Sequence, residues 1–215
     1  MRCALVLALG ALLAFGGTAV RAEPTVDWER GTIAVTAAAA ADLRLPTPAI
    51  ARVAAERTAR SRAKKELLVA ARALPWAGGG TVGARAESDP EVLRALDLAV
   101  DGAATDDVSI QSDGSVVLRL SASMDALAGL SPNPGAPGVV LDGRKHAVVA
   151  AIGYHIVAGK DSYAGPIRFA RSAGAVASGR TAGSVARVKG DEIVVSSGAL
   201  DRLVPPVVIL IGEAK

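Results

Sequence analysis

The sequence predicts an α+β fold in which a long helix and a shorter helix pack on an antiparallel sheet, followed by a smaller β-rich subdomain. The stretch from Thr47 to Leu74 is rich in Ala, Arg, Lys and Leu and contains no proline or glycine after Pro48, which is typical of one long helix. Short β-branched runs next to turn residues lie on both sides of it. After residue 138, glycines recur between short apolar runs, which favours strands over helices.

The first residues predict export. Arg2 precedes an apolar run from Leu5 to Phe15, which at roughly 11 residues is too short to span a bilayer and is typical of a secretory signal peptide. Val20-Arg21-Ala22 resembles a cleavage site with small residues, so residues 1–22 would be removed by cleavage after Ala22. We therefore expect a periplasmic or secreted protein.

Composition excludes several classes of site. Cys3 is the only cysteine and would leave with the signal peptide, which excludes disulfides, thiol catalysis and thiolate metal sites from the mature chain. The formal net charge of +3 falls to about +1 without Arg2 and Arg21, so no strong attraction to nucleic acid or anionic lipid is expected. No second apolar stretch approaches the length of a membrane span.

The elements before the long helix begin with a strand. Ile33 to Ala38 is predicted as this strand, although propensity alone favours a helix for Ala37 to Ala41. Pro48 predicts the start of the long helix and Pro75 its end. Along the helix, apolar residues recur at three- or four-residue spacing and predict one face toward a core; they are Ala55, Ala59, Ala63, Leu67, Ala70 and Leu74.

The next elements alternate between loop, helix and hairpin. Gly78 to Gly83 predicts a loop, and Ser88 to Glu91 predicts the capped start of the shorter helix. Val108 to Leu120, with a turn at Ser112-Asp113-Gly114, predicts a β-hairpin. Met124 to Leu130 has room for one or two helical turns.

A proline- and glycine-rich segment at residues 131–138 predicts a linker. It divides residues 23–130, with the helices and the first sheet, from residues 139–215, the β-rich subdomain. Strands are expected in this second part at Val139–Leu141, Val148–Val157, Tyr163–Phe169, Ser184–Val188, Ile193–Ser196 and Val207–Ile211.

Two short patterns resemble catalytic signatures. Ser61 and Lys64 match S-x-x-K, but the partner motifs and the larger fold of penicillin-recognising serine enzymes are missing. Gly78, Gly80 and Gly83 match G-x-G-x-x-G, but a dinucleotide site needs a strand before the glycines, and here a helix precedes them. We interpret the first as a solvated helical turn and the second as a loop.

His146 and His155 are the only histidines. A metal site would need further ligands near them, and a catalytic triad would need a nucleophile and an acid that converge on one of them. We expect no catalytic, cofactor or metal site. The alternative is a periplasmic hydrolase that uses His146 or His155, which requires a pocket that gathers one histidine with a carboxylate and a serine or water.

The long helix carries an excess of positive charge, with seven cations from Arg52 to Arg72 against Glu56 and Glu66. Such a face can be an ordinary solvated surface whose aliphatic stems cover apolar neighbours. It can also contact an acidic partner, such as an envelope protein or an acidic cell-wall component. For that function the predicted partner-binding residues are Arg57, Arg60 and Lys64; export disfavours nucleic acid.

The order of these elements resembles a known family. A strand, a long helix with Ala55, Ala59 and Ala63 before Leu67-Leu68, a second helix, and the Asp113-to-Val116 hairpin resemble the exported family that groups the twenty-kilodalton class of small surface lipoproteins with the N-terminal domain of the flagellar assembly protein FlgT. Gly138 to Arg144 falls where longer bacterial members carry a Leu-Ile-Ile-Asp-Ala-Arg-like strand. A lipid-attachment cysteine is missing, so lipoprotein anchoring does not carry over.

The resemblance implies no catalytic residues. The sequence therefore predicts an exported, non-enzymatic protein of the bacterial envelope that acts as a binding or assembly module, with flagellar assembly as one setting. A purely structural oligomer is the third function class, beside the hydrolase.

Overall fold

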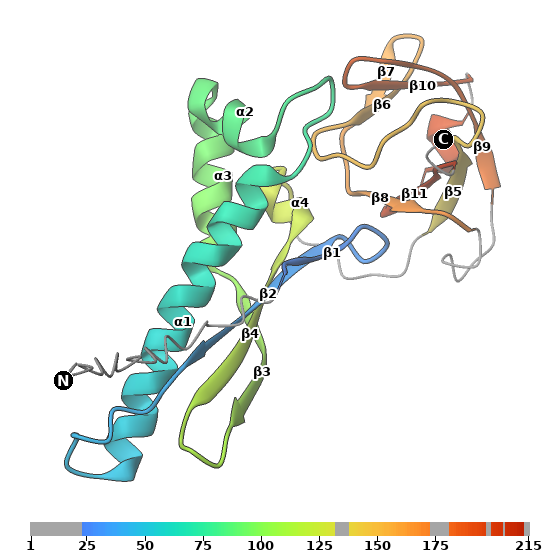
Figure 1. Ribbon diagram of the computed structural model, residues 1–215. Coiled ribbons are helices and arrows are strands. Elements are labelled where there is room, and N and C mark those ends of the chain that lie inside the picture. Colours follow the sequence, from blue (N-terminus) through green and yellow to red (C-terminus); the bar gives the residue numbers. More distant parts are fainter. Residues whose placement is uncertain (1–22, 132–137, 173–180, 197–198, 204, 213–215) are drawn as a thin grey trace, which may run out of the picture.

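The computed structural model describes residues 23–131, 138–172, 181–196, 199–203 and 205–212 and confirms the α+β fold (Figure 1). A four-stranded sheet with its helices forms what we call the N-terminal unit, and a seven-stranded sheet forms the C-terminal unit. The predicted signal peptide and residues 132–137 of the predicted linker lie outside the described residues. The linker falls between the two sheets in chain order.

The sheet of the N-terminal unit is antiparallel throughout, as expected from its hairpin signals. Its order is β1 (Thr25–Asp27), β2 (Thr32–Ala39), β4 (Val116–Ser123) and β3 (Ala104–Ile110). Residues alternate along β4 between buried and half-buried, which places one face of the strand in the core. The predicted hairpin joins β3 to β4, and the helical propensity of Ala37 to Ala41 is overridden because Ala37 to Ala39 pair with β4.

Helix α1 (Pro48–Ala73) covers one face of this sheet and contacts β2 and β4 (Figure 1). The Thr47 side chain caps its start by accepting a hydrogen bond from the backbone N–H of Ile50 (3.3 Å), and Pro48 occupies the first turn. Pro75 follows Leu74 at its end, as predicted.

The buried stripe of α1 differs from the predicted one in two ways: it begins at Ala51, and it contains Ala71 in place of Ala70. Ala71 is fully buried, whereas the predicted Ala70 is only half-buried. The stripe keeps a strict four-residue spacing, which advances about 40° around the helix at each step and so follows the twist of the sheet. It consists of Ala51, Ala55, Ala59, Ala63, Leu67 and Ala71.

Two more helices, α2 (Val82–Ser88) and α3 (Pro90–Asp101), pack beside α1. The prediction missed α2 because three glycines precede it, but Thr81 caps its start by accepting a hydrogen bond from the backbone N–H of Ala84 (3.2 Å). Asp89 caps α3 by accepting a hydrogen bond from the backbone N–H of Glu91 (3.0 Å), whereas Ser88, the first residue of the predicted capping box, ends α2. A single-turn helix, α4 (Met124–Leu127), follows β4 directly.

The seven-stranded sheet of the C-terminal unit is mixed. Strands β5, β11 and β8 run parallel, and β6 with β7 and β9 with β10 pair antiparallel. In spatial order the strands are β7 (Asp161–Tyr163), β6 (His155–Ala158), β10 (Glu192–Val195), β9 (Thr181–Lys189), β5 (Val139–Asp142), β11 (Val207–Leu210) and β8 (Ile167–Ala170). A short 3₁₀ turn, η2 (Leu200–Arg202), precedes β11.

One predicted strand is mostly wrong. Val148–Val157 does not form a continuous strand, because β6 begins only at His155. Before it, Ile152 forms an isolated bridge with Trp76 of the N-terminal unit instead of joining the larger sheet. This segment therefore connects the two units.

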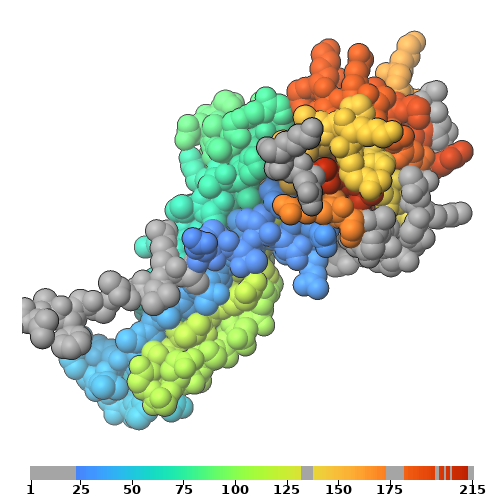
Figure 2. Space-filling view, turned by 45° about the vertical axis from the view of Figure 1, so that its right-hand side comes forward, coloured from blue at the N-terminus to red at the C-terminus, as the bar shows by residue number. Residues whose placement is uncertain are grey.

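Each unit has its own apolar core, and Trp28 packs against both. The space-filling view shows the blue segment that holds β1 between the green helical part and the orange and red C-terminal unit (Figure 2). Within the described residues, no helix has the length and apolar character needed to cross a membrane.

The α1 stripe gives a stability prediction. Leu67 is 0% exposed, so Leu67→Asp should lower the free energy of unfolding by about 3–5 kcal/mol through a lost apolar contact and a buried carboxylate. Val69→Asp is the matched control, because Val69 is 58% exposed on the same helix and its change should cost about 0.5 kcal/mol or less. Urea titration followed by circular dichroism measures both; equal losses would contradict the assigned stripe.

Asp142 gives a pH prediction. Hydrogen bonds from the Arg144 side chain (2.7 and 3.0 Å), and then from its backbone N–H, lower the pKa of Asp142 from 3.8 to about 2. A depressed folded-state pKa adds stability above pH 3.8 that is lost as pH falls through 2. Asp142→Asn should be less stable near neutral pH by about 1 kcal/mol or less, since water screens the pair. The difference from wild type should vanish near pH 2 in acid titrations; a constant difference would contradict this.

Candidate functional site

The junction between the two units begins at Trp28 and Phe169. The backbone N–H of Phe169 on β8 donates a hydrogen bond to the Trp28 carbonyl (3.1 Å), and the two rings meet edge to face with centroids 5.9 Å apart. Tyr154 contacts Phe169 at the same centroid distance. Aromatic contacts of this geometry contribute about 0.5–1.5 kcal/mol beyond the area they bury.

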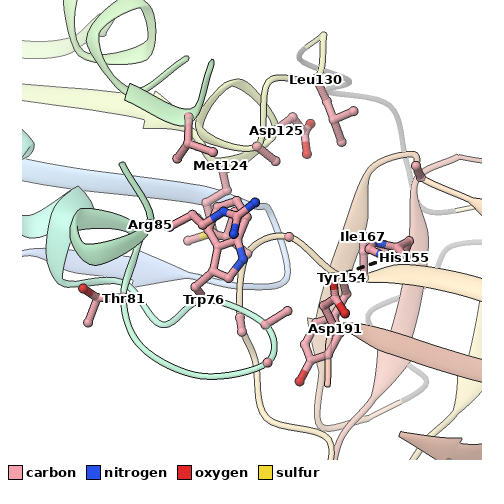
Figure 3. Close-up of a pocket in the computed structure, with 18 of the residues that line it drawn as sticks. Trp76, Thr81, Arg85, Met124, Asp125, Leu130, Tyr154, His155, Ile167 and Asp191 are labelled. Carbon is pink, nitrogen blue, oxygen red and sulfur yellow. Dashed lines mark ion pairs between the residues drawn. The ribbon is translucent and has the colours of Figure 1, made fainter. Parts of the chain in front are cut away.

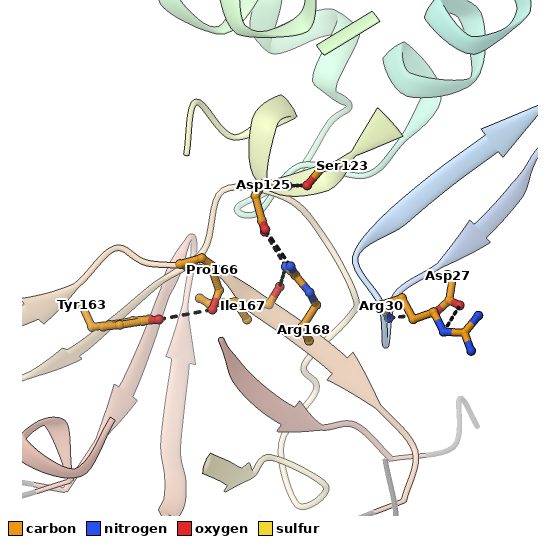
Figure 4. A network of polar contacts seen from close by, with 8 residues as sticks. All are labelled: Asp27, Arg30, Ser123, Asp125, Tyr163, Pro166, Ile167 and Arg168. Carbon is orange, nitrogen blue, oxygen red and sulfur yellow. Dashed lines mark hydrogen bonds and ion pairs between the residues drawn. The ribbon is translucent and has the colours of Figure 1, made fainter. Parts of the chain in front are cut away.

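A buried ion pair lies next to this aromatic contact. Arg168 on β8 is 4% exposed and Asp125 on α4 is 3% exposed, and the two side chains point toward each other from opposite units (Figure 4). The guanidinium donates to both carboxylate oxygens, with the Nη2–Oδ2 distance at 2.6 Å. A buried charge without such a partner would cost several kcal/mol, so each residue requires the other.

Gly31 makes room for the guanidinium. Its backbone has φ +65°, and a Cβ at this position would lie 2.4 Å from Arg168 Cζ. The adjacent backbone also ties the turn to α4, because the N–H of Met124 donates to the Gly31 carbonyl (2.8 Å). Any side chain at position 31 would therefore displace Arg168 from Asp125.

Tyr163 borders the same ion pair. Its hydroxyl donates a hydrogen bond to the Pro166 carbonyl (3.3 Å; Figure 4). Burial raises the pKa of Tyr163 to about 12; the negative charge of Asp125 adds to this shift and the positive charge of Arg168 opposes it. Tyr163 therefore stays neutral over the physiological range and acts as a hydrogen-bond donor.

The last contact of the junction joins the α1–α2 connection to the segment before β6. The N–H of Ala77 donates to the Ile152 carbonyl (2.8 Å), and the N–H of Ile152 donates to the Pro75 carbonyl (3.0 Å). Trp76 packs on Gly153, where a Cβ would lie 2.6 Å from the indole ring. Backbone and side chain together hold Trp76 in place.

Between these contacts lies a cavity of about 670 Å³, which we call the cleft. Both units line it: Trp76, Thr81 and Arg85 come from the N-terminal unit, whereas Tyr154 and His155 come from the C-terminal unit (Figure 3). Cavities that bind small molecules are usually about 300–1,000 Å³ in volume, largely apolar and equipped with a few converging polar groups. The cleft has these properties.

The chain places its aromatic residues at this cleft. After residue 22 the sequence contains only five aromatic side chains, and four of them line the cleft: Trp28, Trp76, Tyr154 and Phe169. The fifth, Tyr163, borders the ion pair beneath it. The cores of both units are filled almost entirely by aliphatic side chains, so the aromatic residues are concentrated where the units meet.

The polar groups of the cleft occur in pairs. His155 Nε2 lies 3.4 Å from Asp191 Oδ2, and the backbone N–H of His155 donates to the Asp191 carbonyl (3.1 Å). On the opposite wall, the Arg85 guanidinium lies over the Trp76 ring at 5.9 Å and pairs with Asp89 at 3.0 Å. Figure 3 shows Trp76 and Arg85 facing the His155–Asp191 pair across the cleft.

The structural requirements of the hydrolase alternative are met only in part. The cleft gathers His155 with a carboxylate, but none of the described residues that line it is a serine. The Thr81 hydroxyl is engaged as the cap of α2. The described residues contain no group of three or more side chains suited to hold a metal ion.

His146 lies in a different place. It lines a broader cavity of about 1250 Å³ on the other side of the Trp28–Phe169 contact, together with the end of α1 and residues 144–150. Trp28 and Phe169 each line both cavities, so the contact between these two residues forms the wall between the cavities. The two histidines are therefore not brought together.

The predicted partner-binding residues on α1 differ in their surroundings. Arg57 is exposed, whereas Arg60 and Lys64 are half-buried and bind within the N-terminal unit. Arg60 pairs with Glu56 (3.0 Å) and donates to the Thr105 hydroxyl (2.9 Å). Lys64 pairs with Asp101 at the end of α3 (3.0 Å). Part of the cationic face therefore fastens the helix to its neighbours, and binding by these residues stays a prediction.

Sequence reasoning named His155 as a candidate but missed the other residues that build the cleft and its junction. Asp125 and Arg168 are 43 positions apart, and no local motif connects them. One signal was present: Arg168 lies between the apolar residues Ile167 and Phe169, a position at which a charge would be buried. The concentration of aromatics was invisible because the four residues come from separate stretches of the chain.

The buried ion pair gives the stability prediction of the junction. Arg168→Leu should lower the free energy of unfolding by about 3–5 kcal/mol, because Asp125 would remain buried without its partner. Adding Asp125→Leu should recover part of the loss, since both charges are then absent. Arg44→Leu is the control: Arg44 pairs with Asp42 on an exposed loop, and its loss should leave stability unchanged.

Urea titration followed by tryptophan fluorescence is the measurement, since Trp28 and Trp76 both lie at the junction. A single variant no less stable than wild type, or a double variant less stable than Arg168→Leu, would contradict the assignment.

Comparison with known proteins adds no relative: no protein family matches the chain, and no curated protein matches it. The resemblance to the exported lipoprotein and FlgT-like family therefore stays a prediction from the sequence.

Proposed function

We propose that this chain is an exported, non-enzymatic protein of the bacterial envelope that acts as a binding or assembly module and holds its ligand in the cleft. The observation that carries the proposal is that the cleft is lined by four aromatic side chains and by paired polar groups from both units. Export itself rests on the N-terminal sequence of residues 1–22.

The junction supports binding because it builds the cleft in advance. The Trp28–Phe169 contact, the buried Arg168–Asp125 pair and the backbone bonds at Ile152 all fasten the two walls together. A site whose walls are already ordered avoids much of the entropy cost of fixing side chains and loops when a ligand enters. Such rigidity favours recognition of one shape.

The polar groups of the cleft suit hydrogen bonding to a ligand better than bond cleavage. A His–Asp pair becomes a hydrolytic device when the histidine can take a proton from a nucleophile. The described hydroxyls that line the cleft belong to Thr81, which caps α2, and Tyr154, which is half-buried against Phe169. His155 and Asp191 instead offer a donor and an acceptor side by side.

The exposed part of α1 is the competing surface for the same function. Arg57, Arg52 and Lys65 are exposed there, and an acidic envelope component would be attracted to them. Arg60 and Lys64 contribute less to this surface because they bind Glu56 and Asp101. One experiment can separate the two surfaces.

Sedimentation with isolated bacterial envelopes tests the function. Labelled protein covering residues 23–215 should sediment with envelopes, and Trp76→Ala should lose most of this binding because the aromatic wall of the cleft is removed. Arg57→Glu should bind as wild type does. Leu98→Ala is the control, since Leu98 is exposed on α3 and does not line the cleft.

The outcomes separate the possibilities. Wild-type protein that fails to sediment would overturn the binding function. Loss of binding by Arg57→Glu with retention by Trp76→Ala would move the site to the helix. Envelope-independent oligomers in light scattering, together with failure to sediment, would favour the structural class.

A further inference from the structure

Most charges around the cleft are paired with an opposite charge. Arg85 is paired with Asp89, Arg168 with Asp125, and His155 lies beside Asp191. Each cation among these groups has a carboxylate nearby, so none of them is available alone to a strongly anionic ligand. A cationic ligand would meet the guanidinium that already covers one face of Trp76. The electrostatics therefore favour a neutral ligand.

Trp76 lines the cleft and is held in a fixed orientation. The Arg85 guanidinium lies over its ring, and its edge packs on Gly153, so the indole cannot turn without losing both contacts. Arg85 is itself held by Asp89. A rigid aromatic plate of this kind binds a flat apolar face at low entropy cost.

The wall opposite Trp76 carries two polar side chains, His155 and Asp191. His155 and Asp191 lie across the cleft from the indole and are exposed enough to reach a ligand (Figure 3). Gly78 and Gly79 also line the cleft and present backbone without a side chain. A ligand between the walls therefore needs one apolar face and a set of hydroxyl or amide groups on the other side.

A pyranose ring has this character. Its C–H groups form an apolar face that stacks on aromatic rings, and its hydroxyls hydrogen-bond in pairs to groups such as imidazole and carboxylate. The cleft volume of about 670 Å³ lies within the range of about 300–1,000 Å³ that is usual for small-ligand sites. An extended apolar ligand fits less well, because it would displace water from His155 and Asp191 without replacing the hydrogen bonds of that water.

We propose that the cleft binds a neutral saccharide of one or two pyranose rings, which stacks on Trp76 and hydrogen-bonds to the His155–Asp191 pair. This inference rests on the proposed binding function and names its ligand class. The carboxylate of Asp191 accepts hydrogen bonds from ring hydroxyls, and the imidazole of His155 orients that carboxylate.

Titration calorimetry with defined sugars tests the proposal. The neutral probes are maltose, cellobiose and N,N′-diacetylchitobiose, and the charged probes are glucuronic acid, glucosamine and inorganic phosphate. At least one neutral disaccharide should bind and should change the tryptophan fluorescence, because both tryptophans of the chain line the cleft. The charged probes should bind more weakly or not at all.

Matched variants assign the contacts. Trp76→Ala should weaken saccharide binding by about tenfold or more, whereas Trp76→Phe, which keeps an aromatic plate, should weaken it much less. Asp191→Asn should weaken binding by about tenfold through the loss of charge-assisted hydrogen bonds. Leu98→Ala should bind as wild type does. Each variant is compared at equal folded fraction, judged by its urea unfolding curve.

The results distinguish the saccharide inference from the proposed binding function on which it rests. If no neutral sugar binds but Trp76→Ala still abolishes sedimentation with envelopes, the saccharide class is wrong and the binding function stands. Binding of phosphate or glucosamine in preference to the neutral sugars would also overturn the class. Neutral-sugar binding unaffected by Trp76→Ala and Asp191→Asn would place the saccharide elsewhere and overturn the site.

Discussion

The cleft depends on the buried pair between Arg168 and Asp125. Each charge sits almost entirely out of water, so neither is tolerable without the other, and the pair forms only when β8 and α4 are brought together. The pair therefore fixes the relative position of two units that have separate apolar cores. Gly31 belongs to the same constraint, since only a residue without Cβ leaves room for the guanidinium. Charge and shape therefore specify the junction together with the apolar contact between Trp28 and Phe169.

The placement of the aromatic residues follows from the division of the chain into two units with separate cores. Alanine at four-residue spacing lets α1 lie close on its sheet, and valine, isoleucine and leucine fill the C-terminal core. Phe169 is the only aromatic residue among the buried residues of the two described cores, and four of the five aromatic residues after residue 22 line the cleft. There they contribute rigid contact surface, as Trp76 does between Arg85 and Gly153. This distribution is the strongest argument that the cleft is a recognition site and more than a packing gap.

The cationic helix has a more mixed role than its composition suggests. Arg60 and Lys64 hold α1 to β3 and to the end of α3, and Arg62 donates to the Ala38 carbonyl of β2 (2.9 Å). These long side chains use their stems to cover apolar surface and their charges to satisfy nearby oxygens. Much of the positive charge thus serves the fold of the N-terminal unit, and Arg57 is the member of the predicted set that faces solvent.

Local patterns in the sequence determined most of the fold. The long helix with its proline boundaries, the β3–β4 hairpin, the capped start of α3 and the strand-rich second half all follow from propensity, periodicity and turn residues, which act over a few positions. The tertiary structure decided the rest. It moved the buried stripe from Ala70 to Ala71, because the helix must follow a twisted sheet. It also withheld residues 148–154 from the larger sheet, because Ile152 pairs with the α1–α2 connection. The cleft could not be predicted, because Asp125, Arg168, Trp76 and His155 meet only through contacts between distant segments, and no local spacing encodes such contacts.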